Sequence, residues 1–327
     1  MPPLAGAGRG IVGIDIGGTK IAAAIVAKGG TFVERRVVPT SAGRGALGVL
    51  GTLVGLVDDL RREASAQAVT VLAVGVATAG MVDRSTGVVS RATDAFPDLL
   101  GLPLREELER QFGLPVVLLN DVHAMAIGEQ SAGSGDSDGH ALYVVVGTGV
   151  GGALTRAGSL VLGDHGFAGD IGHVVIDSSP TARRCPCGRL GHLEAYVSGP
   201  ALAREYERRS GCAPLDGDLQ PVAARASGGE RLARDVLREG AQFLGRAVGG
   251  LVNLLDPEIV VFGGGLLGLD GSLFWDRVGE CLTAEVRSGS LPRVERARLG
   301  NDAAIVGAGL AAFHAAPWLR QAEENWH

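Results

Sequence analysis

The chain has few cysteines, few aromatic residues and no run of basic residues. Four cysteines occur among 327 residues, and aromatic residues make up 4% of the sequence. Cysteines this sparse and irregularly spaced favour a reducing cytosol over a disulfide scaffold. The formal net charge is −6, and no basic cluster offers a nucleic-acid surface. We therefore expect a cytoplasmic protein that binds small molecules and no nucleic acid.

A signal peptide and a membrane-spanning run are also lacking. The N-terminal "MPPLAGAGRG" has neither a charged start nor an apolar centre. The most apolar stretches, such as "AQFLGRAVGGLVNLLDP", contain charge before they are long enough to cross a bilayer. We expect no membrane partner. What is abundant is apolar sequence, at 46%, together with 52 glycines clustered between the apolar runs, which predicts a sizeable core and many tight turns.

Short apolar runs alternate with helical patterns, and this predicts an α/β protein. Residues 10–38 are typical of three strands joined by glycine turns, and residues 140–163 repeat that order. A change of lobe is expected near residue 118. Further buried strands are expected over 69–80, 115–121 and 257–268, and helices over about 46–63, 104–113, 230–255 and 301–321.

Three glycine clusters each follow an apolar strand, namely "DIGGTK" (15–20), "GTGVGG" (147–152) and "GGGLLG" (263–268). Backbone amides in such turns can cradle phosphates. Any one of them alone is more often a simple tight turn, but three together favour a nucleotide. The candidate nucleotide-binding residues are Asp15 (also a candidate to hold hydrated Mg²⁺), Gly17, Gly18, Thr19, Lys20, Thr148, Gly149, Gly151, Gly263, Gly264 and Gly265.

Two common nucleotide motifs are disfavoured. The sequence has no G-x-x-x-x-G-K-[ST], so it is not a P-loop protein. Residues 147–152 satisfy G-x-G-x-x-G, but a dinucleotide fingerprint must open a helix. The following "ALTRAGSLVLG" is typical of strand, turn and strand, which argues against a Rossmann oxidoreductase.

Two polar groups stand out from the apolar pattern. Asn120-Asp121 ends a buried strand, where Asp121 could act as a general base or the pair could simply cap a helix. His173, Cys185, Cys187 and His192 offer two imidazoles and two thiolates, a permitted tetrahedral zinc set. The alternative is a polar loop with two free cysteines beside unrelated histidines.

The segments "VGIDIGGTKIAAAIV", "VVVGTGVGGAL" and "IVVFGGGLLG", in this order, resemble the phosphate and adenosine segments of the two-lobed sugar-kinase/actin-like ATPase (ribonuclease H-like) fold. "CPCGRLGHLE" and "GDIGH" resemble the signature of the ROK family (repressors, open reading frames and sugar kinases). The similarity extends from about residue 10 to the C-terminus. It implies two α/β lobes that enclose ATP and a sugar, a small lobe of 1–118 completed by a helix at about 301–327, and a larger zinc-binding lobe of 119–300.

The resemblance also implies residue roles. Asp121 would take the proton of the sugar 6-hydroxyl, and a structural zinc would be held by His173, Cys185, Cys187 and His192. His192 stands where the family usually has a third cysteine, Asp170 where it has glutamate, and Asp94 where glucokinases of the family have asparagine. The implied sugar-binding residues are Gly80, Asp94, Asn120, Asp170, His173 and Glu194.

The expected activity is ATP-dependent phosphorylation of the 6-hydroxyl of glucose or a related hexose. Alternatives of the same class are N-acetylmannosamine, N-acetylglucosamine and aminoglucose (kanosamine-type) 6-kinases. A sugar-responsive repressor is disfavoured, because only ten residues precede the first expected strand and Asp121 is retained. The family resemblance implies a homo-oligomer, either a dimer or a tetramer.

Overall fold

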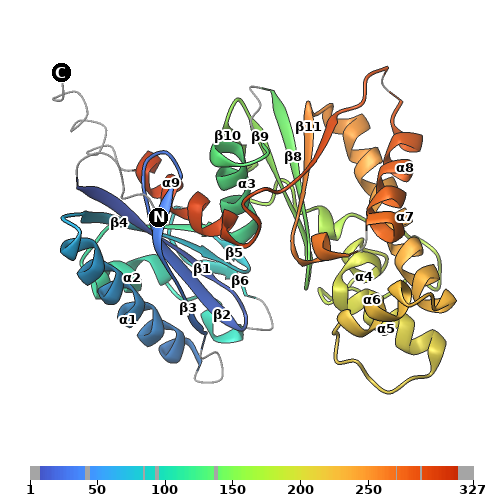
Figure 1. Cartoon of the computed structure of the whole chain (residues 1–327), viewed down its shortest axis with the longest axis horizontal. Helices are drawn as coiled ribbons and strands as arrows, with labels where there is room; N and C mark the ends of the chain where they lie inside the picture. Colours follow the sequence, from blue (N-terminus) through green and yellow to red (C-terminus); the bar gives the residue numbers. More distant parts are fainter. Residues whose placement is uncertain are drawn as a thin grey trace. The chain divides into compact units, whose positions relative to one another are not determined.

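The computed structural model describes residues 8–40, 45–83, 85–92, 96–135, 139–269, 271–287 and 289–315 (Figure 1). Contacts divide the chain into two compact units. Unit 1 comprises Met1–Asp136, Gly158–Ala168 and Ala297–His327, and unit 2 comprises Ser137–Ala157 and Gly169–Arg296. The functional lobes expected at 1–118 and 119–300 remain a prediction.

The first sheet has the strand order β3-β2-β1-β4-β7. Its strands are β1 (Arg9–Ile16), β2 (Lys20–Val26), β3 (Phe32–Pro39), β4 (Thr70–Thr78) and β7 (Val116–Asn120). β1, β2 and β3 form an antiparallel meander, whereas β1, β4 and β7 run parallel. The three strands and glycine turns predicted for residues 10–38 are confirmed. A small hairpin of β5 (Met81–Val82) and β6 (Val89–Arg91) was not predicted.

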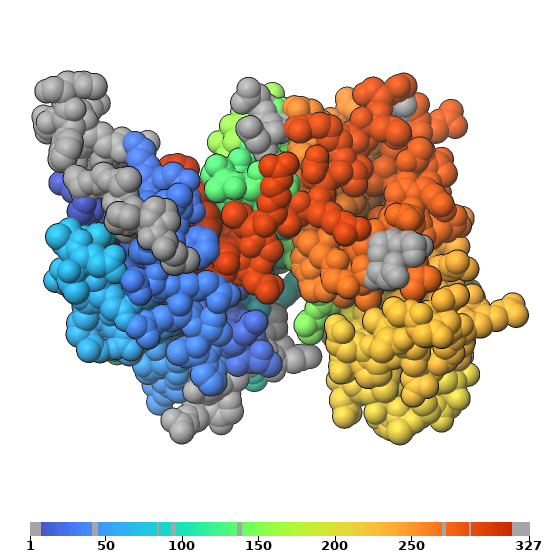
Figure 2. All heavy atoms as spheres, in the orientation of Figure 1, coloured from blue at the N-terminus to red at the C-terminus, as the bar shows by residue number. Residues whose placement is uncertain are grey.

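Helices cover both faces of the first sheet (Figure 1). α1 (Gly45–Ala66) and α2 (Leu104–Phe112) pack on the face that carries the large aliphatic side chains. α3 (Asp121–Ala132) and α9 (Ala303–Ala315) pack on the other face, which is lined largely by alanine. Figure 2 shows the red C-terminal segment against the blue N-terminal atoms.

Small residues let α9 approach its neighbours backbone to backbone. A Cβ atom on Gly75 of β4 would lie 1.9 Å from the carbonyl oxygen of Ala308, and one on Gly307 would lie 1.7 Å from that of Ala124. Real Cβ atoms do not come this close to other heavy atoms. The glycines in the helical pattern at the end of the chain are therefore packing residues of α9.

The second sheet has the strand order β10-β9-β8-β11-β12. β8 (His140–Val146), β9 (Val150–Arg156) and β10 (Ser159–Val161) follow the predicted strand-turn-strand-turn-strand order, and β11 (Ile259–Gly263) and β12 (Arg293–Arg296) complete the sheet. β8, β11 and β12 run parallel. Because β9 is a strand, the segment after "GTGVGG" opens no helix, and the argument against a Rossmann site is confirmed.

The helices of unit 2 pack around one large hydrophobic core, in which α7 is the longest helix. They are α4 (Glu194–Val197), α5 (Gly199–Ser210), α6 (Gln220–Ser227), α7 (Arg231–Leu255) and α8 (Asp276–Glu285). Shorter turns of 3₁₀ or π-helix span Pro97–Leu99, Ile171–His173, Gly265–Gly268, Gly271–Trp275 and Gly300–Asp302. Within the described ranges, no helix has the length and apolarity needed to cross a bilayer.

A buried carboxylate binds the two segments at which the chain first leaves unit 1 and last returns to it. The Oε2 atom of Glu129, on α3, accepts from the backbone N–H of Ser134 at 2.8 Å and of Arg298 at 3.0 Å. Its Oε1 atom accepts from the N–H of Leu299 at 2.8 Å. Glu129 is fully buried, so these bonds replace the water it loses on folding.

Candidate active site

The carboxyl ends of three parallel strands place Asp15, Thr78 and Asn120 at one edge of the first sheet. Asp15 is in register with Ala77, and Thr78 with Asn120. In open α/β sheets, ligands bind outside this edge. The structure thus brings Asp15 and the Asn120-Asp121 pair to the same edge, although more than a hundred residues separate them in the sequence.

Asn120 is the N-cap of α3. Its Oδ1 accepts from the backbone N–H groups of Val122 at 2.9 Å and His123 at 3.3 Å. Its Nδ2 donates to the carbonyl oxygen of Gly80 at 2.7 Å and to Oδ1 of Asp121 at 2.9 Å. All hydrogen-bonding positions of this amide are therefore used. The helix-cap alternative from the sequence holds for Asn120, and its amide also orients the neighbouring carboxylate.

Asp121 is the first residue of α3 and also accepts from the N–H of Val122. Burial raises the pKa of its carboxyl group to about 6, although hydrogen bonds from Val122 and Asn120 act in the opposite direction. A carboxylate whose pKa lies near neutral pH is suited to general-base chemistry.

Asp15 lies close enough to Asp121 for their charges to interact. Burial, and then the charge of Asp121, raise the pKa of Asp15 to about 7, while Lys20 lowers it. Two carboxyl groups that repel each other attract a cation and are stabilised by it. The pair therefore suits a site that receives Mg²⁺, which is the role predicted for Asp15.

The first glycine turn is closed by a residue that the sequence did not single out. The N–H of Gly17 donates to the carbonyl oxygen of Lys20 at 3.0 Å, and the hydroxyl of Thr40 donates to that of Gly17 at 2.7 Å. Thr40 is buried, whereas Gly18, Thr19 and Lys20 are exposed. These two hydrogen bonds fix the buried side of the turn, from which the exposed residues Gly18, Thr19 and Lys20 project. Thr40 is one of several threonines that follow apolar segments, and its sequence context carries no distinguishing signal.

The second and third glycine clusters meet at the carboxyl ends of adjacent parallel strands. Gly263 of β11 is in register with Val145 of β8. Gly264 has a φ of +94°, and a Cβ atom there would lie 2.4 Å from the carbonyl oxygen of Val146. Only glycine fits this position. The turn at 147–149 and the cluster at 263–265 therefore form one glycine-lined edge in unit 2.

The four predicted zinc ligands are neighbours in unit 2. One ligand atom from each of His173, Cys185, Cys187 and His192 lies within 4.8 Å of the other three. Sγ of Cys187 lies 3.2 Å from Nδ1 of His192, and the two imidazole rings stack at 5.2 Å. A tetrahedral zinc ion with bonds of about 2.0–2.3 Å holds its ligand atoms roughly 3.3–3.8 Å apart.

The donor set fits a zinc ion. Nδ1 of His173 is the one buried side-chain nitrogen or oxygen, among the residues described, that has no hydrogen-bond partner. A buried polar atom without a partner lowers the stability of the fold, so a bound metal ion would explain why this one persists. The loop also makes a tight turn of the kind that holds two cysteines around a metal. The N–H of Gly188 donates to the carbonyl oxygen of Cys185 at 2.9 Å, and Gly188 has a φ of +90°. With two imidazoles and two thiolates, the site leaves no open position for catalysis.

Glu194 joins this cluster to the second glycine turn. Its Oε2 accepts from the N–H of Val150 at 2.9 Å, and its Oε1 lies 3.8 Å from Sγ of Cys185. A Cβ atom on Gly149 would lie 2.8 Å from the same Oε2. The carboxylate predicted to bind sugar thus contacts the end of the turn predicted to bind phosphate. No pattern in the sequence indicates this contact.

The structure describes two of the three other predicted sugar-binding residues. Asp170 precedes the turn that carries His173, whose N–H donates to the carbonyl oxygen of Asp170 at 3.2 Å. Asp94 lies outside the described residues. Gly80 has a φ of +94°, and a Cβ atom there would lie 2.2 Å from the carbonyl oxygen of Arg91, so its backbone path requires glycine. Their roles in sugar binding remain predictions.

Comparison with known proteins agrees with this architecture. The ROK family model matches residues 11–314. A glucokinase of Halalkalibacterium halodurans is 30% identical over 97% of this chain and 96% of its own, and an N-acetylmannosamine kinase of Salmonella arizonae is 33% identical over 91% and 97%. The crystal structure of a ROK family glucokinase from Streptomyces griseus, in complex with glucose and AMPPNP, superposes with a TM-score of 0.78 at 30% identity, covering 92% of this chain and 98% of that one.

The chain belongs to the ROK family. Its fold is the sugar-kinase/actin-like ATPase fold that the three glycine segments predicted.

Proposed function

We propose that the protein transfers the γ-phosphoryl group of ATP to the 6-hydroxyl of glucose or a closely related hexose. The observation that carries the proposal is the desolvated Asp121 carboxylate, held beside Asp15 at the carboxyl edge of the first sheet. The glucokinase relatives support glucose as the first substrate to test.

Each group then has a defined task. Asp121 accepts the proton of the attacking hydroxyl, and Asn120 fixes the orientation of that carboxylate. Asp15 would hold hydrated Mg²⁺, and this ion would supply neutralisation of the phosphate charge. The amides of the glycine turn at 17–20 in unit 1, and of those at 147–149 and 263–265 in unit 2, are the groups proposed to bind the nucleotide. Phosphoryl transfer depends mainly on such positioning and charge neutralisation.

A zinc ion held by the Cys/His cluster would have a structural task. It would fix the loop from Cys185 to His192 and, through it, the start of α4 where Glu194 lies. Glu194, His173 and Asp170 would then bind sugar hydroxyls. In this proposal the protein works in the cytoplasm as a dimer or tetramer.

N-acetylmannosamine is the second candidate substrate, because a kinase of that name is 33% identical over nearly its whole length. ADP release should be measured with glucose, mannose, N-acetylmannosamine, N-acetylglucosamine and an aminoglucose, each with and without Mg²⁺. We expect the highest kcat/KM with glucose. No sugar-dependent ADP release from any member of the panel would contradict the proposed function.

A further inference from the structure

Unit 2 contains a cavity of about 570 Å³ that none of the proposed steps uses. Its walls come from the cysteine loop, the start of α4 and one side of α5. Four guanidinium groups and one carboxylate line it. The lining residues are Thr181, Arg183, Arg184, Ala195, Ala201, Arg204, Glu205 and Arg208.

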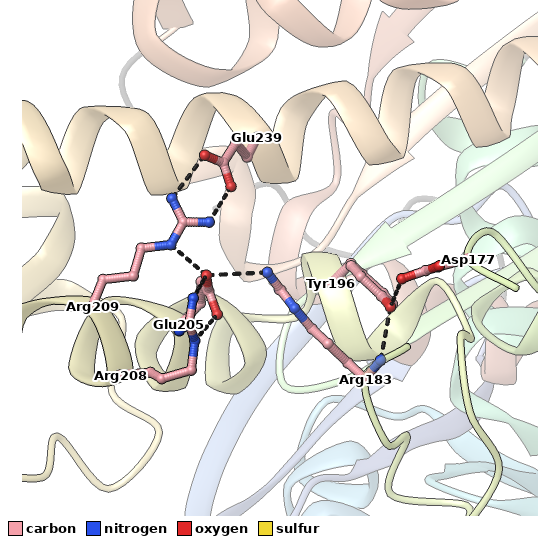
Figure 3. A network of polar contacts seen from close by, with 7 residues as sticks. All are labelled: Asp177, Arg183, Tyr196, Glu205, Arg208, Arg209 and Glu239. Atoms are coloured by element: carbon pink, nitrogen blue, oxygen red, sulfur yellow. Dashed lines mark hydrogen bonds and ion pairs between the residues drawn. The ribbon is translucent and has the colours of Figure 1, made fainter. Parts of the chain in front are cut away.

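The carboxylate in this cavity is already surrounded by arginines (Figure 3). Glu205 is buried and accepts hydrogen bonds from Arg208, at 2.8 and 3.0 Å, and from Arg209. Arg183 lies 3.3 Å from it and stacks on the ring of Tyr196. Burial opposes ionisation of Glu205, but these arginines outweigh it and hold its pKa at about 2.

The remaining charge is not balanced. Arg209 also pairs with Glu239, and Asp177 accepts from the hydroxyl of Tyr196 close to Arg183. In and beside the cavity, five arginines thus outnumber three carboxylates, namely Arg183, Arg184, Arg204, Arg208 and Arg209 against Asp177, Glu205 and Glu239. Arg204 is exposed and makes no hydrogen bond or ion pair with any described residue, and Arg184 donates to the carbonyl oxygen of Gly188.

We propose that this arginine cavity binds a small anion that carries phosphate groups, either an inorganic phosphate such as pyrophosphate or a sugar phosphate. Guanidinium groups match phosphate oxygens in bidentate pairs, and arginines already held by a carboxylate lose less freedom on binding. The volume is within the range of small-molecule sites. Arg204 supplies a positive charge that no carboxylate pairs with among the described residues. Arg184 and Arg208 line the same cavity and can donate further hydrogen bonds to the anion.

An anion here stabilises the loop that carries the Cys/His cluster. Arg184 immediately precedes Cys185, and the N–H of Arg183 donates to the hydroxyl of Tyr196 at 2.8 Å. Ala195, on the cavity wall, follows Glu194 directly. Occupancy of the arginine cavity therefore restrains residues on both sides of the loop from Cys185 to His192.

Calorimetric titration of the full chain tests this proposal. Pyrophosphate, glucose 6-phosphate and inorganic phosphate are titrated at constant ionic strength, with saturating AMPPNP and Mg²⁺ present to occupy the nucleotide site. We expect saturable binding that Arg204→Ala weakens about tenfold or more, the effect of one lost charge-assisted hydrogen bond. The matched control is Arg231→Ala, which removes an arginine that is 95% exposed and lies outside the cavity, and should leave binding unchanged.

The outcomes separate the alternatives. Tighter binding of pyrophosphate identifies an inorganic ligand, and tighter binding of glucose 6-phosphate identifies a sugar phosphate. Equal affinities in Arg204→Ala and Arg231→Ala, or no saturable binding, overturn the proposal. It is also overturned if Arg204→Ala changes only the oligomeric state in size-exclusion chromatography, since the cavity is then a contact between copies.

Discussion

The two sheets have the same order and direction of strands but carry different chemistry. Each begins with an antiparallel meander whose first turn is rich in glycine, and each continues into parallel strands, β1-β4-β7 in one and β8-β11-β12 in the other. At the parallel carboxyl edge, the first sheet presents Asp15 and Asp121. The second presents glycine turns, and β8 and β11 end in no carboxylate of their own. Glu194 reaches the turn after β8 from α4, but its Oε2 accepts from the backbone N–H of Val150.

The difference shows how one backbone arrangement can serve two tasks. A glycine turn offers backbone N–H groups to an anion whatever surrounds it. Carboxylates added at the same edge turn an anion cradle into a site for a cation and a proton. In the proposed function, the first sheet therefore carries the reaction centre, and the second supplies a binding surface in the unit that also holds the Cys/His cluster.

The largest effect is expected from Asp121→Asn. Loss of the proposed base should lower kcat by roughly a thousandfold, within the usual range for general-base removal. The thermal stability of the fold should not fall. The pKa of Asp121 in the folded chain is raised above its usual value, so its contribution to stability is present at low pH and lost as pH rises through about 6. At pH 8 the variant should thus melt at the same temperature as the parent chain or higher.

The matched control is Asp58→Asn, which removes an exposed carboxylate on α1 and should leave kcat unchanged. Sugar-dependent ADP release and differential scanning calorimetry provide the two measurements. If Asp121→Asn retained more than a tenth of the parent kcat, another group would have to be the base.

The next largest effect, on zinc affinity in unit 2, is expected from His192→Ala. We expect one zinc ion per chain, and loss of a ligand should lower zinc affinity by more than the 10- to 100-fold typical of an outer-shell partner. Competition with a chromogenic chelator measures the affinity. Cys212→Ser, which removes a free cysteine outside the cluster, is the control. His192→Cys should bind zinc more tightly than the parent chain, because it adds a negative charge. Equal zinc content in His192→Ala would show that this histidine is no ligand.

A smaller effect is expected from Gly75→Ala in the first sheet. The added methyl group would overlap the backbone of α9, so we expect a loss of about 2 kcal/mol in the free energy of unfolding. Gly51→Ala, in α1, meets no neighbour within 4 Å and should instead gain about 0.5–1 kcal/mol. Urea denaturation measures both variants. A Gly75→Ala variant as stable as the parent chain would contradict the close packing of α9.

The smallest effect concerns pH. A base must be ionised to act, so kcat/KM should fall tenfold per unit below an apparent pKa of about 6. Asp15 has the higher pKa, about 7, and is still protonated where Asp121 ionises, so Asp15→Asn should leave this limb near pH 6, even where its rate is low. A limb that moved to lower pH in Asp15→Asn would show that Asp15 ionises before Asp121.

The sequence predicted the parts of the fold that follow from local pattern. Both meanders, α1, α2, α7 and β11 were predicted, because apolar periodicity and glycine turns identify them. The hairpin of β5 and β6 was missed, since two or three residues carry no period. Thr40 and Glu129 were missed because their partners are distant backbone groups. The arginines of the cavity are spread over the cysteine loop and α5, and only the folded chain collects them around Glu205.

Glu129 has a consequence for how the chain is joined. The bonds from Ser134 and from Arg298 and Leu299 mean that the first exit from unit 1 and the last return to it are both bound to the same two oxygen atoms. Replacing this side chain would release both segments at once. One residue in the last turn of α3 therefore holds these two connections together, and its amide analogue, Glu129→Gln, is the simplest way to weaken both.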